Sequence, residues 1–150
     1  MPGINRPPLV IADTDAIIAF VMREDANHER SKSLMQELAD KQAHILFPIT
    51  AICEATTTLQ RKMNNPTGAQ QVMEQLQSDT FPVLAVTQEA LHIAASLFKP
   101  HGSKQNTLFD ALVAASARLH NADAIFSFDE WYRKLGFTLV EDFISAEKAA

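Results

Sequence analysis

Short apolar runs alternate along the chain with longer segments in which apolar residues recur at helical spacing. The short runs predict strands at residues 9–12, 44–47, 81–86, 124–128 and 137–140. The longer segments predict helices at about residues 16–22, 27–43, 51–63, 69–78, 87–98, 108–120 and 131–135. The strands are apolar at consecutive positions, as in a parallel sheet that is buried on both faces. We therefore predict a three-layer α/β/α domain with a central parallel sheet of about four to five strands.

Polar and turn-forming residues mark the ends of several predicted helices. Thr50 and Thr87 are predicted N-caps, the second in a capping arrangement that lacks its acidic partner. Residues 64–68, Asn-Asn-Pro-Thr-Gly, predict a turn. Thr107 begins an alanine-rich helix, so that Asp110 falls in its first turn.

The composition is that of an ordinary globular domain. Its 150 residues, 47% hydrophobic and 21% charged, suit a single domain over residues 1–150, with flexible ends at 1–8 and 145–150. The apolar runs are too short to span a bilayer, and no signal segment is recognisable, so we expect no membrane association and a cytoplasmic location. The only cysteine, Cys53, excludes an intrachain disulfide and is expected to be buried.

The net charge of −5, from 13 basic and 18 acidic residues, changes what nucleic-acid binding would require. A protein with this balance has no general positive field, so it would have to contact phosphates through a local group of basic residues. A divalent cation held by several of the acidic residues would reduce the negative charge at such a site.

Four acidic residues stand at positions where a parallel sheet would gather them. Asp13 follows the first predicted strand and Asp129 follows the fourth, so both should lie at the carboxyl edge of the sheet. Glu54 and Asp110 would join them if each lies in the first turns of a helix that leaves this edge. A single aspartate at such a position is more often a cap, but Glu54 and Asp110 both interrupt apolar runs, where an unpartnered charge is costly.

Converging carboxylates repel one another unless they are protonated or bind a cation. Mg²⁺ and Mn²⁺ prefer such oxygen ligands, and a water held by the ion and oriented by a carboxylate is a nucleophile for a phosphodiester. The pattern therefore predicts a metal-dependent hydrolase, with either one ion or two.

The acidic residues also lie in segments with a recognisable order and spacing. Asp13 lies within residues 10–19, Glu54 within 50–55, Asp110 within 107–117 and Asp129 within 125–129. Over residues 10–140 this ordered set resembles the PIN-domain nucleases and, among them, the VapC-type toxins of toxin–antitoxin systems. Each motif is weak singly, whereas the ordered set is fairly specific.

The resemblance implies a PIN-like fold and an endonuclease that cleaves single-stranded RNA with Mg²⁺ or Mn²⁺. It implies a toxin that is often a homodimer and that a cognate antitoxin protein keeps inactive. Under this resemblance, the metal is carried by Asp13, Glu54, Asp110 and Asp129. Ser127 matches the family's small hydroxyl residue two places before the last acid, where it can bind the carboxylates or a metal-bound water.

Asp15 departs from the family pattern, because Ser, Thr or Asn is more common at this position. It either adds a charge at the edge of the site or caps the following helix, and we favour the cap.

Two further residues are candidates for contacts with the substrate. Lys104 lies in a polar loop, residues 101–106, that leads into the helix of Asp110 and could close over RNA. Asn106 would share a helix face with Asp110 if the helix extends back that far. Other basic residues are interpreted as surface charge: Arg61, Lys62, Arg118, Arg133 and Lys134. Trp131 and Tyr132 are interpreted as core residues under a short helix rather than as base-stacking residues.

Two other functions fit part of the pattern. A haloacid-dehalogenase-like phosphatase would use Asp13 as its nucleophile and could use Thr50, but it leaves Glu54 and Asp110 unexplained and finds no convincing lysine partner. A non-catalytic PIN-like binding domain is disfavoured because all four acidic positions are filled.

Overall fold

The computed structural model describes residues 6–150 and contains one parallel sheet. Its strands are β1 (Leu9–Ala12), β2 (His44–Pro48), β3 (Val83–Leu84) and β4 (Ala124–Phe126), in the order β3-β2-β1-β4. The central strand β1 pairs with β2 through Val10 and Ile45, and with β4 through Ile11 and Ile125. The predicted parallel sheet is thereby confirmed.

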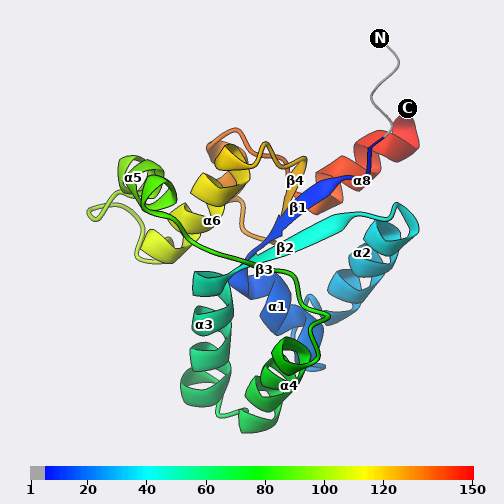
Figure 1. Cartoon of the computed structure of the whole chain (residues 1–150), viewed down its shortest axis with the longest axis vertical. Helices are drawn as coiled ribbons and strands as arrows, with labels where there is room; N and C mark the ends of the chain where they lie inside the picture. Colours follow the sequence, from blue (N-terminus) through cyan, green and yellow to red (C-terminus); the bar gives the residue numbers. More distant parts are fainter. Residues whose placement is uncertain (1–5) are drawn as a thin grey trace.

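The helices lie on both sides of this sheet (Figure 1). They are α1 (Thr14–Val21), α2 (His28–Asp40), α3 (Ile49–Thr57), α4 (Pro66–Gln77), α5 (Gln88–Leu97), α6 (Leu108–Leu119), α7 (Trp131–Lys134) and α8 (Val140–Ala149), and a π-helical turn, η1 (Thr58–Lys62), continues α3. Helices α2 and α8 pack on one face of the sheet, and α3 and α6 on the other. This arrangement confirms the three-layer α/β/α prediction. Within residues 6–150, no helix combines the length and apolar character needed to cross a membrane.

The alternation of side chains along β1 explains why its sequence is apolar at every position. Val10 and Ala12 pack toward α2 and α8, where Leu38 is buried. Ile11, between them, packs on the opposite face against α3 and α6. These three strand residues are at most 1% exposed, so the strand ends in a fully buried setting and delivers Asp13 into it.

Three predicted strands differ from the observed ones, and the one expected at 124–128 ends at Phe126. The strand expected at 81–86 is only Val83–Leu84, at the edge of the sheet. The strand expected at 137–140 is wrong, because Leu139 makes a single bridge to Ile125 and Val140 already begins α8.

Of the two predicted N-caps, at the starts of α3 and α5, one is wrong and one is confirmed. Thr50 is not an N-cap, because α3 begins at Ile49, two residues before the predicted start at residue 51. Thr87 is the N-cap of α5, as predicted, and its side chain accepts from the Ala90 N–H at 3.1 Å. Cys53, expected to be buried, is exposed on α3.

The turn expected at residues 64–68 ends sooner than predicted. Pro66 is favourable in the first turn of a helix, because it has no N–H that would need a partner there. The Asn65 side chain caps α4 by accepting from the Gly68 N–H at 2.9 Å. The proline therefore begins a helix here instead of extending the turn.

The two ends of the described chain are held in different ways. Residues 1–5 of the predicted flexible end lie outside the described residues, while Arg6 makes a two-pronged ion pair with Asp123 at 2.9 and 3.0 Å. Residues 145–149, expected to be flexible, form the last turns of α8, a helix that the sequence pattern did not predict.

Candidate active site

Asp13 is held at the carboxyl end of β1 by the sheet itself. Its backbone N–H donates to the Phe126 carbonyl at 3.0 Å, which extends the pairing of β1 with β4 by one residue. Its carboxylate is the N-cap of α1 and accepts from the Thr14 N–H at 2.7 Å. The residue is only 3% exposed, so the structure buries a carboxylate where the sequence predicted one.

The second carboxylate oxygen of Asp13 lies beside two hydroxyl groups. Tyr132 donates to Oδ2 at 2.8 Å, and the Ser127 Oγ lies 3.1 Å from the same atom. Ser127 is itself 3% exposed and also accepts from the Asp129 N–H at 3.1 Å. Ser127 therefore connects Asp13 to Asp129, as expected for a residue that orients the carboxylates.

The helix-cap interpretation of Asp15 is wrong. The N-cap of α1 is Asp13, while the Asp15 carboxylate reaches across to the end of β4. Its Oδ2 accepts from the Phe128 N–H at 2.8 Å and lies 3.0 Å from the Ser127 Oγ. These contacts join residues more than a hundred positions apart, which local sequence signals do not reveal.

Asp110 lies in the first turn of α6, as predicted, and has a structural role there. Thr107 and Asp110 form a capping box, in which the Asp110 Oδ2 accepts from the Thr107 N–H at 2.8 Å. One carboxylate oxygen of Asp110 thus accepts a hydrogen bond at the start of its helix. The other remains available to what we call the acidic group, the carboxylates of Asp13, Glu54, Asp110 and Asp129.

Glu54 lies in the second turn of α3, which begins at Ile49, and so within the first turns of its helix as predicted. Its charge raises the pKa of Asp110, and α3 and α6, which carry these two residues, pack together in the core.

Asp129 is held by one local group and by one group from the loop before α6. Its Oδ1 accepts from the Trp131 N–H at 2.9 Å, and its Oδ2 accepts from the Asn106 Nδ2 at 2.8 Å. Asn106 does not share a helix face with Asp110, because α6 begins only at Leu108. It reaches the site from the preceding loop, whereas Lys104 of the same loop is exposed.

Burial and mutual repulsion both act on these acids. Burial raises the pKa of Asp13 well above its usual range, and the charges of Asp15 and Asp110 raise it further. Burial likewise raises the pKa of Asp15 to about 6, against the opposing effect of its hydrogen bonds. Burial, together with the charges of Glu54 and Asp129, raises the pKa of Asp110 to about 6.

These directions predict how the metal-free protein responds to pH. A carboxyl group whose folded-state pKa is raised binds its proton more tightly when folded, so its contribution is favourable below the unfolded value and is lost as the pH rises through about 6. We expect Asp110→Asn to gain stability relative to the original protein between about pH 4 and pH 7 in the presence of a chelator. Thermal melting across this range measures the difference, and parallel stability curves would contradict it.

The donor set fits a hard divalent cation. The Asp15 Oδ1 is buried and lacks a hydrogen-bond partner among the described residues, and the neighbouring groups are carboxylate oxygens, which Mg²⁺ and Mn²⁺ prefer. Within residues 6–150, no three Asp, Glu, His or Cys side chains are arranged so that they could together hold a metal ion. Mg²⁺ commonly binds through one or two carboxylates and keeps several waters, so some of these acids would contact the ion directly and the others through its waters.

Tyr132 is a site residue that the sequence reasoning missed. It is fully buried, as expected for a core residue, but its hydroxyl donates to Asp13 and lies 3.4 Å from the Asp110 carbonyl. Burial and the charge of Asp13 raise the pKa of Tyr132 well above its usual range, so the group stays a donor. The sequence offered one indication of this role. A tyrosine that is expected in the core has a hydroxyl group, and a buried hydroxyl needs a hydrogen-bond partner.

The basic residues that were interpreted as surface charge differ in their contacts. Arg133 binds Asp142 at 2.7 and 2.9 Å, and Arg118 stacks over the Phe137 ring. Arg61 and Lys62 are exposed on η1, which continues the helix of Glu54.

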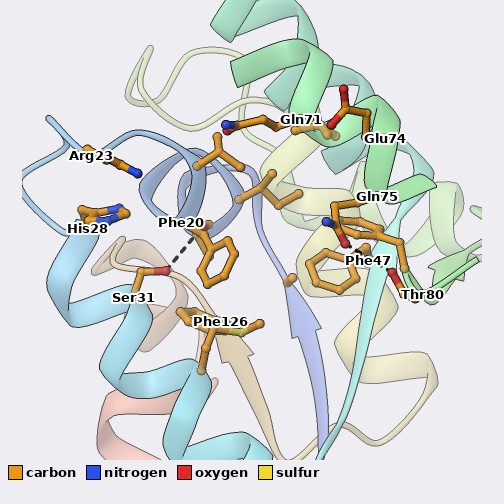
Figure 2. A pocket seen from close by; sticks show the side chains of 17 residues that line it. Phe20, Arg23, His28, Ser31, Phe47, Gln71, Glu74, Gln75, Thr80 and Phe126 are labelled. Carbon is orange, nitrogen blue, oxygen red and sulfur yellow. Dashed lines mark hydrogen bonds between the residues drawn. The ribbon is translucent and has the colours of Figure 1, made fainter. Parts of the chain in front are cut away.

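A cavity of about 600 Å³ is lined in part by Ala12 of β1 and by Ala16 and Phe20 of α1. Figure 2 shows it between α1, α2 and α4, with Phe20, Phe47 and Phe126 around it. None of the predicted acidic residues lines this cavity. The walls of this cavity are mainly apolar, so it suits an apolar side chain of a partner rather than a cation or a phosphate.

The fold and the acidic group together define an α/β domain with a buried carboxylate centre at the carboxyl edge of its sheet. The PIN domain family model matches residues 10–138, and the chain belongs to this family. The family match removes the basis for the haloacid-dehalogenase-like alternative. No curated protein matches the chain significantly.

Solved structures share the fold at low sequence identity. Mycobacterium tuberculosis VapC20, described as a Sarcin-Ricin loop cleaving toxin, has a TM-score of 0.73 and 22% identity over 86% of this chain and 96% of its own. Rickettsia felis VapBC2, bound to a DNA fragment from its promoter, has a TM-score of 0.62 and 14% identity over 87% and 96%. Neisseria gonorrhoeae FitAcB has a TM-score of 0.58 and 19% identity over 81% and 88%.

Proposed function

We propose that this protein is a metal-dependent endoribonuclease that cleaves single-stranded RNA, and that it is the toxin of a toxin–antitoxin pair. The observation that carries the proposal is the group of carboxylates around the buried Asp13, whose repulsion a divalent cation would relieve. Membership of the PIN domain family and the similarity to VapC20 support it.

Asp13, Glu54, Asp110 and Asp129 would hold Mg²⁺ or Mn²⁺. When bound, the ion supplies a positive charge that activates water and stabilises the phosphate oxygens. Ser127 and Tyr132 orient the Asp13 carboxylate, and Asn106 orients that of Asp129. These hydrogen bonds fix the carboxylates before substrate binds, which lowers the cost of arranging them during the reaction.

Lys104 is proposed to contact the RNA backbone. It is exposed in the loop that also carries Asn106, and Asn106 binds Asp129 directly. A phosphate contact there would help to offset the net negative charge of the chain.

An antitoxin is the proposed protein partner, and the apolar cavity between α1, α2 and α4 is a suitable place for it to dock. Phe20, which lines the cavity, is 46% exposed, and α1 also carries Asp13 and Asp15 at its other end. A partner on this surface would therefore lie against the helix that begins in the acidic group. A homodimer is proposed from the family resemblance alone.

The test is hydrolysis of labelled single-stranded RNA by the purified protein, with Mg²⁺ or Mn²⁺ and then with excess chelator. We expect internal cleavage that the chelator abolishes and added metal restores. Cleavage that persists in chelator, or turnover of phosphomonoesters alone, would contradict the proposal. RNA binding without cleavage in either metal would favour the non-catalytic PIN-like domain. In cells, expression should arrest growth, and co-expression of the antitoxin should relieve the arrest.

A further inference from the structure

The two carboxylate oxygens of Asp15 have different surroundings. Oδ2 accepts from the Phe128 N–H at 2.8 Å and lies 3.0 Å from the Ser127 Oγ. Oδ1 is buried and has no hydrogen-bond partner among the described residues, although the nearby Ala16 N–H lowers the pKa of the carboxyl group. A buried carboxylate oxygen without a donor is unfavourable. The hydrogen bonds of Oδ2 therefore account for the burial of only one of the two carboxylate oxygens.

The unpartnered oxygen belongs to a strongly negative region. The Ser127 Oγ lies within 3.1 Å of Asp13 and 3.0 Å of Asp15, and its single hydrogen can be donated to only one of them at a time. The charge of Asp129 acts on Asp15, and the charge of Asp15 acts on Asp110. A proton or a cation would stabilise a further oxygen in such surroundings.

We propose that Asp15 is a fifth carboxylate of the metal centre and that its Oδ1 binds the divalent cation. This inference rests on the proposed function, because it requires the same centre to bind metal. It assigns to Asp15 a role that its hydrogen bonds to the end of β4 do not require. Those bonds hold Oδ2 in place, and they thereby orient Oδ1.

The substitution Asp15→Asn separates the two roles of this side chain. Asparagine keeps the size of aspartate and one oxygen that can accept from Phe128 and Ser127, but it removes the anionic oxygen. We expect the dissociation constant for Mn²⁺, measured on the full chain by calorimetry without RNA, to rise by about tenfold or more. Asp40→Asn, on the exposed end of α2, is the matched control and should bind Mn²⁺ like the original protein.

The outcomes separate this inference from the proposed function. Unchanged or tighter Mn²⁺ binding by folded Asp15→Asn would overturn the role of Asp15 and would indicate that the side chain carries a proton. Failure of the original protein to bind Mn²⁺ would overturn both proposals. If Asp15→Asn does not fold, Asp15→Ser provides the same comparison, with the same loss of affinity expected and unchanged affinity overturning the inference.

Discussion

Asp13→Asn is expected to lower the rate of metal-dependent RNA cleavage by roughly two to three orders of magnitude, equivalent to about 3–4 kcal/mol of lost transition-state stabilisation. Asp13 is the most buried of the acids and the one to which Ser127 and Tyr132 both point. Asparagine keeps the shape of the side chain but lacks the charge that would hold the cation. Single-turnover cleavage at saturating Mn²⁺ measures the loss.

The same substitution should not destabilise the metal-free protein. Its amide oxygen can accept from Thr14, and its NH₂ group can donate to the oxygens of Ser127 and Tyr132. It also removes a buried charge that Asp15 and Asp110 repel. We expect an equal or higher melting temperature in chelator, with Asp40→Asn as the control for loss of one negative charge. Cleavage at the original rate by the folded variant would refute the role of Asp13.

The part of the site that the sequence predicted is the part that follows from strand ends and helix starts. Asp13 and Asp129 could be placed because the residues that directly follow parallel strands lie at the same edge of the sheet. Asp110 could be placed because Thr107 marks the start of α6. Glu54 was assigned to the first turns of its helix, and it lies in the second turn of α3 because that helix begins directly after Pro48.

The remaining part depends on contacts between distant segments. The Asp15 carboxylate of α1 accepts a hydrogen bond from the Phe128 N–H, and the Tyr132 hydroxyl of α7 donates one to Asp13. Neither contact has a local spacing that could predict it. A polar atom on a residue expected in the core shows that a partner is required, but only the packing of α7 beside the end of β1 and the start of α6 determines which partner it is.

Tyr132 provides the second large effect, and two substitutions separate its packing from its hydrogen bond. Tyr132→Ala removes a fully buried ring and is expected to lower the free energy of unfolding by about 3–5 kcal/mol. Tyr132→Phe keeps the ring and its edge contact with Trp131, so it should lose less stability. Urea denaturation in chelator measures both changes.

Tyr132→Phe should nevertheless affect the acidic centre. Without the hydroxyl, the Asp13 Oδ2 retains Ser127 as its only side-chain donor among the described residues, and Ser127 also serves Asp15. We expect Mn²⁺ affinity or the cleavage rate to fall by about tenfold, as is usual when a group that orients a metal ligand is lost. If both remain at the original values while Tyr132→Ala unfolds, the hydroxyl only satisfies a buried carboxylate, and Asp13 is oriented by Thr14 and Ser127 without it.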